Sequence, residues 1–411
     1  MNVQRQSERV TAGAAQAGAA EAGAAQAGAG AEQAAAGRIP GDGRPLPVVL
    51  WRRLTGAAVA PPPGAPGSTL LRHLAVLAVA AVALVAASYG LAPFRNYQLA
   101  TVAAYLCATA GLTVLTGLNG QLSLGHGALM ATGAYTVALT QNALSDAGVV
   151  GGWILLVSLG LAVTVTVGAG AVIGLAAARL RGPYLAGVTL AVAVVVPALA
   201  TTFDGVFNGE QGLSVYVDPP PVALGPTFPY ERWQAWLATS AALVTMLLLA
   251  NLVRSRFGRA FRAVRDDEVA ARLAGIHVAR TQVLAFVVSA ACAGLGGGLL
   301  AVLAQSVSPG AFSLNLSLFL LMAIVIGGLG SLAGAVWGAL LLVALPELTH
   351  AATESLTLSP AAAQRLDGNL PLAIFGVTLM IVMIVAPGGI QRLLSRIGRR
   401  AGARWRRPDA P

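Results

Sequence analysis

The chain of 411 residues contains no lysine, and only 10% of its residues are charged. Soluble domains carry about 25% charged residues, so the sequence excludes an ordinary soluble protein. The phosphate-binding loop of ATPases needs a lysine, and Schiff-base enzymes need one as well, so both classes are excluded. We therefore expect a chain without an ATPase site of its own, whose energy is supplied by something else, and we do not expect an enzyme.

Cysteine and histidine are also scarce, with two and four residues. Cys107 and Cys292 lie in apolar runs, which is typical of small packing residues and not of a disulfide framework. The histidines are scattered, and no H-E-x-x-H or G-x-S-x-G motif occurs. The sequence therefore predicts no catalytic residues, no metal site and no cofactor.

What the chain does have is apolar length, with 56% hydrophobic residues and a mean hydropathy of +0.73. Uncharged runs of about 20 residues are long enough to cross a bilayer as helices. The predicted fold class is all-α, a polytopic helical membrane protein with about ten transmembrane or re-entrant helices. The ten ranges are about 70–92, 97–117, 122–143, 152–178, 183–203, 233–253, 281–304, 313–328, 330–346 and 370–386. The third, eighth and ninth are short or glycine-broken, so a re-entrant path stays open for each.

Charge is missing from the interior of these spans and is concentrated between them. Proton relays, ion pumps and voltage sensors use intramembrane carboxylates or cations, so these classes are disfavoured. If the spans alternate, 23 of the 26 arginines fall on one side of the membrane. Basic loops face the cytoplasm, so both termini are predicted to be cytoplasmic. The same pattern explains the basic balance without nucleic acid, which we do not expect as a partner.

The sequence divides into three parts. Residues 1–69, with repeats such as AGAAQ and AGAAE, predict a disordered Ala/Gly/Pro-rich cytoplasmic extension. Residues 70–390 predict the membrane domain, and residues 391–411 a basic cytoplasmic tail. Two longer segments, 204–232 and 347–369, are predicted to be ordered loops on the outer face.

One polar motif, TGLNGQLSLGHGA, interrupts the apolar runs at residues 116–128. Its Asn119, Gln121, Ser123 and His126 offer neutral hydrogen-bonding groups at the end of two spans. Polar, glycine-rich breaks at membrane depth are typical of a substrate pathway. Close helix packing at the glycines, or a plain interfacial turn, stays open as an alternative. A second glycine cluster, IGGLGSLAG at residues 326–334, is predicted at the same side of the membrane.

The longest polar segment between spans is residues 254–280, predicted to be cytoplasmic. Asp266 or Asp267 suits the N-cap of a short helix, and Gly275 suits a left-handed residue just past its end. Val269, Leu273 and Ile276 recur at helical spacing and predict an apolar ridge for a partner's groove. The alternative is a solvated or lipid-surface loop whose arginines only set orientation.

Two of these motifs resemble one family. In the loop, Ala270, Ala271 and Gly275 match the E-A-A-x-x-x-G pattern by which permeases of ATP-binding-cassette importers dock on their ATPases, although Glu268 lies one residue early. GQLSLGHGA resembles a segment of the branched-chain amino acid permeases. Three further stretches resemble the larger, M-type permease of this hydrophobic amino acid uptake family: 179–191, 254–276 and 326–339. The resemblance spans roughly residues 97–390.

The resemblance implies a permease subunit that translocates branched-chain amino acids across the bacterial cytoplasmic membrane. The implied partners are a second, H-type permease, two cytoplasmic ATP-binding subunits, an extracytoplasmic solute-binding protein and membrane lipid. It implies an ATPase-coupling role for residues of the loop: Asp267, Glu268, Ala270, Ala271, Leu273, Gly275 and Ile276. Urea, short amides or other amino acids are alternative substrates, and a membrane scaffold or membrane enzyme is an alternative function.

Overall fold

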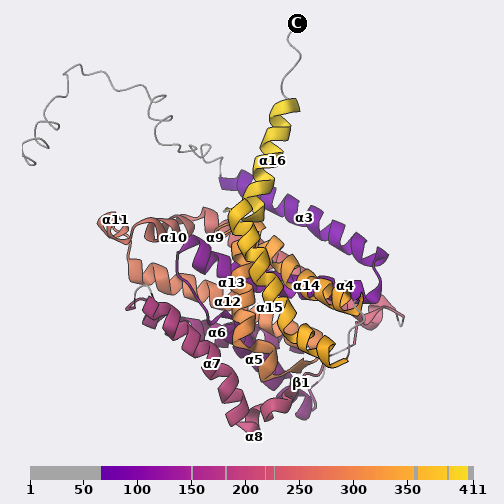
Figure 1. Cartoon of the computed structure of the whole chain (residues 1–411). Coiled ribbons are helices and arrows are strands. Elements are labelled where there is room, and N and C mark those ends of the chain that lie inside the picture. Colours follow the sequence, from indigo (N-terminus) through magenta and orange to yellow (C-terminus); the bar gives the residue numbers. More distant parts are fainter. Residues whose placement is uncertain are drawn as a thin grey trace, which may run out of the picture. The chain divides into compact units, whose positions relative to one another are not determined.

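The computed structural model describes residues 66–149, 151–180, 183–217, 219–225, 227–355, 360–386 and 388–405. The predicted N-terminal extension lies almost wholly outside these residues. The described chain is helical almost throughout (Figure 1), as the apolar composition predicts. One short two-stranded ladder is also present.

The long helices follow the predicted spans closely. They are α3 (Pro66–Gly90), α4 (Pro93–Leu112) with a π-helical end η1 (Thr113–Leu118), α5 (His126–Asp146), α6 (Trp153–Ala177), α7 (Pro183–Thr202), α9 (Tyr230–Arg254), α12 (Val278–Ala304), α13 (Leu314–Gly327), α14 (Leu332–Ser355) and α15 (Pro360–Val385). Each of the ten predicted ranges therefore corresponds to a helix, and the all-α membrane fold is confirmed.

These helices differ in whether their length and apolar composition alone are typical of a membrane span. Seven are long and apolar enough to cross a bilayer among the described residues, and an eighth if α15 and the bent helix after it form one span. Helix α5 does not qualify, because it carries polar side chains along its length and most of it is buried in protein. In α14 only Leu332–Leu348 is apolar. A helix surrounded by other helices does not need a lipid-compatible surface, so a count by hydropathy leaves out a buried, more polar helix such as α5.

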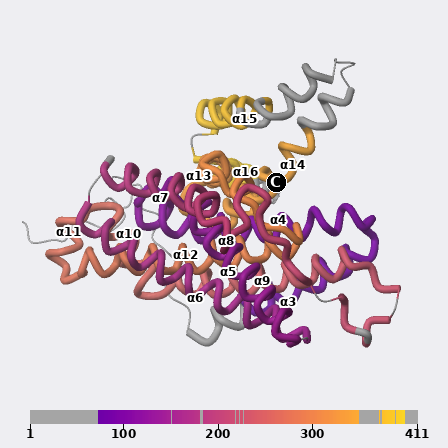
Figure 2. The backbone as a smooth tube through the Cα atoms, turned by 90° about the horizontal axis from the view of Figure 1, so that it is seen from below, coloured from indigo at the N-terminus to yellow at the C-terminus, as the bar shows by residue number. Residues whose placement is uncertain are grey.

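Helix α12 lies at the centre of the bundle, packed against α4, α5 and α6. Its glycines permit this contact. A Cβ on Gly296 would lie 2.7 Å from the Ala104 carbonyl oxygen, and one on Gly297 would lie 2.6 Å from the Met130 carbonyl carbon. Small residues let membrane helices approach closely, so van der Waals contact replaces the hydrophobic effect there. Figure 2 shows α14 and α15 gathered on one side of these helices.

The segment between α7 and α9 is ordered, as predicted. It contains α8 (Asp204–Phe207), the 3₁₀ turns η2 (Gly209–Gln211) and η3 (Val222–Leu224), and strand β1 (Leu213–Ser214). Strand β1 pairs antiparallel with β2 (Ser306–Val307), which is followed by the 3₁₀ turn η4 (Pro309–Phe312). The ladder fixes the segment to the end of α12.

The prediction for residues 347–369 is wrong. Helix α14 continues to Ser355 and α15 begins at Pro360, so most of the predicted loop is helical. The acidic residues of this segment lie within helices instead, Glu347 and Glu354 in α14 and Asp367 in α15. The predicted tail is also helical as far as it is described, in α16 (Gly389–Trp405).

Helix α3 is fixed to α9 near both of its ends. Trp236 Nε1 donates to Ser88 Oγ at 2.9 Å, and His73 Nδ1 donates to Asn251 Oδ1 at 2.9 Å. Arg232, one of the few arginines predicted outside, stacks over Tyr89 at 4.6 Å and donates to the Ser88 carbonyl. Aromatic residues of this kind are typical of a membrane interface.

The predicted orientation is testable by cysteine labelling. Cys107 and Cys292 are buried, so they provide a silent background. Tyr216 is 52% exposed beyond β1, and Leu273 is 86% exposed at the other side of the bundle. In intact cells, an impermeant maleimide is expected to label Tyr216→Cys at once and Leu273→Cys only after permeabilisation. Labelling of both positions in intact cells contradicts the predicted orientation.

Candidate functional site

The motif at residues 116–128 begins where α4 becomes a π-helix. In η1 the backbone N–H of Asn119 bonds the carbonyl of Val114 at 3.1 Å, one residue further back than in an α-helix. Gly120 then has φ +77°, a left-handed conformation that ends the helix. Single π turns inside α-helices are frequent at functional sites. The break therefore combines irregular backbone with a set of polar side chains.

The two glycine clusters meet at this break. A Cβ on Gly117 would lie 2.8 Å from the Gly330 Cα, so only hydrogen atoms fit between the two backbones. Arg265 covers the contact, and its Nη1 donates to the Gly117 carbonyl at 2.9 Å. A Cβ on Gly120 would lie 2.7 Å from the Arg265 Cγ. These glycines therefore allow close packing, which was one of the alternatives for the motif. Both glycine clusters lie beside Arg265 of the loop at 254–280.

The four predicted pathway residues are all buried, but they lie in two different settings. Asn119 and Gln121 have side-chain amide atoms without a hydrogen-bond partner: both amide atoms of Asn119 and the Oε1 of Gln121. His126 starts α5 and its Nε2 donates to the Ala108 carbonyl at 3.0 Å. His126 and the fully buried Ser123 are thus placed among packed helices.

A cavity of about 620 Å³ lies beside the break. Asn119, Gly120 and Gln121 line one wall, and the start of α7 lines a second. The remaining walls come from the helices of the loop at 254–280 and from Gln282 on α12. Ser123 and His126 are absent from its described lining. Small-molecule pockets have volumes of about 300–1,000 Å³, so the cavity is large enough for an amino acid.

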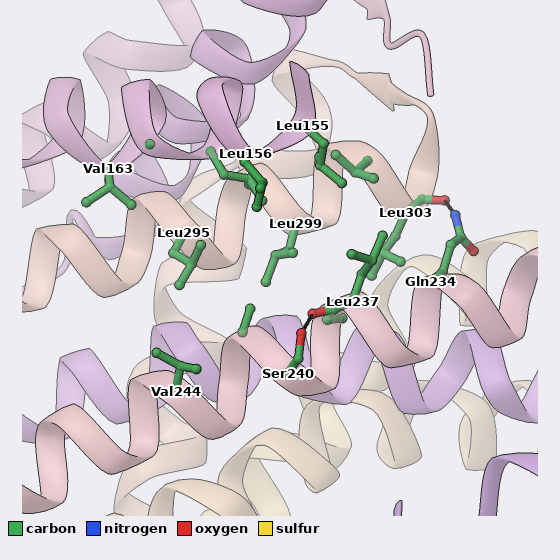
Figure 3. Close-up of a pocket in the computed structure, with 15 residues that line it drawn as sticks. Leu155, Leu156, Val163, Gln234, Leu237, Ser240, Val244, Leu295, Leu299 and Leu303 are labelled. Atoms are coloured by element: carbon green, nitrogen blue, oxygen red, sulfur yellow. Dashed lines mark hydrogen bonds between the residues drawn. The ribbon is translucent and has the colours of Figure 1, made fainter. Parts of the chain in front are cut away.

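A second cavity, of about 420 Å³, lies between α6, α9 and α12 and has a different chemistry. Figure 3 shows leucine and valine side chains pointing into it. Its polar side chains already donate to backbone carbonyls, Gln234 to Leu303 and Ser240 to Leu237. Burying a zwitterion without partners is costly, so this groove suits an apolar chain such as a lipid tail.

The polar loop folds into two helices, where a single short helix was predicted. They are α10 (Arg256–Asp266) and α11 (Glu268–Leu273). Ser255 caps the first, with its Oγ accepting from the Phe257 N–H. Asp267 caps the second, with its Oδ1 accepting from the N–H groups of Val269 and Ala270 at 2.7 and 3.0 Å. Figure 1 shows α10 and α11 side by side at one side of the bundle.

The buried and exposed faces of this helix pair differ clearly. Phe261 and Val264 of α10 are buried against the bundle, and Ala271 of α11 is buried as well. Val269 is 65% exposed and Leu273 is 86% exposed. Ile276 is only partly buried, so the ridge presented to solvent consists mainly of Val269 and Leu273.

Two details of α11 concern residues singled out from the sequence. Gly275 has φ +80°, the left-handed conformation expected just past the helix. Glu268 faces the bundle, because its Oε1 accepts from Gln282 Nε2 at 3.0 Å and its Oε2 lies 3.6 Å from Arg272. Glu268 therefore ties α11 to α12.

Comparison with known proteins gives the family. Residues 94–387 match the family described as branched-chain amino acid transport system / permease component. The chain belongs to this permease family. The high-affinity branched-chain amino acid permease protein LivM of Salmonella typhimurium is 32% identical over 314 residues, 70% of each chain. LivM of Escherichia coli is 33% identical over 267 residues, 59% of this chain and 61% of the relative.

LivH of Escherichia coli, a permease protein of the same named transport system, is 29% identical over 250 residues, which cover 58% of this chain and 79% of LivH. No solved structure matches the chain. The family match includes the glycine break, the helix pair and the second glycine cluster, so the whole site lies inside the permease domain.

The sequence pattern did not indicate a role for Arg265 or Gln282 of the permease. Both contact groups that were singled out, Gly117 and Glu268, yet Arg265 is 148 residues from Gly117. No local pattern indicates a contact at that separation. The one available signal for Arg265 is its place directly after the apolar positions of an amphipathic helix.

The packing of the break is testable by adding one methyl group. Gly117→Ala places its Cβ against the Gly330 backbone, which has no flexible atom to move away, so overpacking of about 1–3 kcal/mol is expected. The thermal unfolding midpoint of the purified permease should fall. Gly168→Ala on α6 is the control, because no atom lies within 4 Å of the added Cβ. Equal midpoints for the two variants contradict the close contact.

Proposed function

We propose that the chain is the M-type permease subunit of an ATP-binding-cassette importer for branched-chain amino acids in the bacterial cytoplasmic membrane. The observation that carries this proposal is the contact between the glycine-rich break and the helix pair α10–α11, in a chain whose relatives are named for branched-chain amino acid transport. The first element provides a polar opening in an apolar bundle, and the second presents an exposed apolar ridge beside it.

The division of work among subunits follows from what the chain lacks. With no lysine, it has no conventional ATP site, so two separate ATP-binding subunits are proposed to supply energy through α11. The relatives named LivM and LivH support pairing with a second, H-type permease. An extracytoplasmic solute-binding protein is proposed to deliver the substrate to the ordered segment around β1.

The ATPase-coupling role is assigned to α11 and its ends: Asp267, Glu268, Ala270, Ala271, Leu273, Gly275 and Ile276. Asp267 and Gly275 fix where the helix begins and ends. Glu268 and the buried Ala271 hold it to the bundle. Leu273 is exposed on the opposite side, where it is available to a groove on the ATPase.

The substrate pathway is proposed to pass the break, with Asn119 and Gln121 as its polar contacts. Their unpartnered amide atoms offer hydrogen bonds to a zwitterion that passes the break. Ser123 and His126 support the pathway by holding its wall, since His126 bonds α5 to the backbone of α4.

The pathway predicts a selective effect of Gln121→Leu. The change keeps the approximate volume and removes the amide, so leucine uptake by the reconstituted complex should fall about fivefold, as expected for one hydrogen bond of about 1 kcal/mol. Assembly with the other subunits should be unchanged. Gln98→Leu at the other end of α4 is the control, since it removes only an exposed contact with Arg95. Equal uptake by both variants contradicts the pathway assignment.

The coupling role predicts that Gly275→Val separates assembly in the membrane from ATPase binding. At φ +80° a β-branched residue costs about 1–2 kcal/mol, which shifts the end of α11 and displaces Leu273. The variant should insert and pair with its sister permease, yet lose ATPase co-purification or transport. Ala274→Val is the matched control, because φ there is −79°. Normal transport by Gly275→Val with its ATPases bound would mean that the loop only sets orientation.

A further inference from the structure

The cavity beside the break has one apolar wall and one acidic wall. Leu180, Leu185 and Ala186, around the start of α7, form much of the apolar wall. Asp266, Asp267 and Glu268 form the acidic wall, and Arg265 is the single cation in the described lining. Leu122 and Asp266 at the rim are more than half exposed, so the cavity is open to solvent.

The charges in this cavity do not cancel. Arg265 is already paired with Asp266 at 2.8 Å and donates to the Gly117 carbonyl. Asp267 accepts from N–H groups of α11. Glu268 accepts from Gln282, and its other carboxylate oxygen lies 3.6 Å from Arg272. The acidic wall therefore has a net negative charge and attracts a cationic group such as an ammonium.

A second, independent observation comes from the break. Asn119 is 2% exposed, yet neither its Oδ1 nor its Nδ2 has a hydrogen-bond partner, and the Oε1 of Gln121 is also unpartnered. Leaving buried amide groups unpaired costs about 1–3 kcal/mol each. Amides beside a solvent-open cavity indicate a ligand that completes their hydrogen bonds, and the Asn119 Nδ2 suits a carboxylate.

We propose that this cavity is an inner binding site for a hydrophobic amino acid arriving from the cytoplasm, and that its occupation slows import. The α-ammonium group lies against Asp267 and Glu268, the carboxylate accepts from the Asn119 amide, and the aliphatic side chain packs on Leu180 and Leu185. The inference rests on the proposed function for its substrate class and for the side of the membrane.

The position of the cavity explains how occupation acts on transport. Its walls belong both to the break and to the helix pair α10–α11. A ligand that contacts both favours the arrangement seen here over one in which the helices have moved, and a ligand shifts an equilibrium by its differential affinity for the two states. An internal amino acid therefore opposes the movement that α11 transmits.

The test compares two phenylalanine variants on α7. Ala186→Phe places a ring at the wall of the cavity beside Leu185, whereas Ala191→Phe places the same ring on an exposed position of the same helix. The complete permease–ATPase complex is purified in detergent without the solute-binding protein, and binding of labelled leucine is measured. We expect the wild type and Ala191→Phe to bind alike and Ala186→Phe to bind at least tenfold more weakly. Equal leucine affinity in all three overturns the proposal.

A second variant that conserves side-chain volume tests the site even if Ala186→Phe does not fold. Asn119→Asp places a negative charge beside the ligand carboxylate, so leucine affinity should also fall at least tenfold. An unchanged affinity overturns the proposal.

The proposed slowing of import is tested by measuring leucine uptake into vesicles. The complexes are reconstituted with their binding protein into vesicles of phosphatidylethanolamine and phosphatidylglycerol, loaded with leucine or with buffer. The ratio of initial uptake in buffer-loaded vesicles to that in leucine-loaded vesicles should be several-fold for the wild type and Ala191→Phe. For Ala186→Phe this ratio should be close to one, whatever the absolute uptake rate of the variant. Equal slowing in all three contradicts the regulatory role. Absence of uptake by the wild type in buffer-loaded vesicles contradicts the proposed function instead, while the detergent binding measurement still decides the cavity.

Discussion

The contact between Gly117 and Gly330, covered by Arg265, is the constraint on which the rest of the site depends. Two helix breaks far apart in the sequence approach so closely that a single Cβ does not fit between them. The guanidinium of Arg265 then joins the Gly117 carbonyl to the last turn of α10. Under the proposed function, this contact couples a displacement of α10 and α11 to the end of α4, where the backbone is π-helical. The break, the cavity and the helix pair form one mechanical unit.

The helices around the break, the cavity and the helix pair pack together through small residues and neutral hydrogen bonds. Glycines of α12 allow backbones to touch, and hydrogen bonds from threonine and serine hydroxyls to their own helices satisfy polar groups in the apolar interior. Many of the described charged residues lie in α10 and α11, where Arg265 is paired with Asp266 and Glu268 lies near Arg272. This separation leaves Asn119 and Gln121 as neutral groups at the boundary between the apolar interior and the charged helices.

Much of the fold could be predicted from the sequence because a membrane imposes strong local rules. Each predicted span is a helix, and Asp267 and Gly275 take the capping and left-handed roles expected of them. The number of spanning helices is less predictable, because α5 is buried by its neighbours and its polar side chains lower its hydropathy below that of a lipid-facing span. Most of the loop predicted at residues 347–369 is helical, and α14 continues past Pro346 to Ser355.

The site itself was only partly predictable. Local pattern placed Asn119 and Gln121 at a break, but it could not separate them from Ser123 and His126, which pack between helices. The spacing of residues along the sequence does not indicate contacts between distant segments. The contact of the two glycine clusters beside Arg265 is therefore visible only in the structure. The same limit applies to the cavity, whose walls come from four separate segments.

The most direct test of the mechanical unit is the amount of substrate moved per ATP hydrolysed by the reconstituted importer. Arg265→Gln shortens the side chain and removes the guanidinium bond to Gly117. Arg262→Gln on the same helix is the control, since Arg262 bonds only the Val253 carbonyl among its recorded contacts. The account predicts that Arg265→Gln keeps ATPase activity while substrate moved per ATP falls at least tenfold, with Arg262→Gln near the wild type. An unchanged ratio in Arg265→Gln would contradict the account.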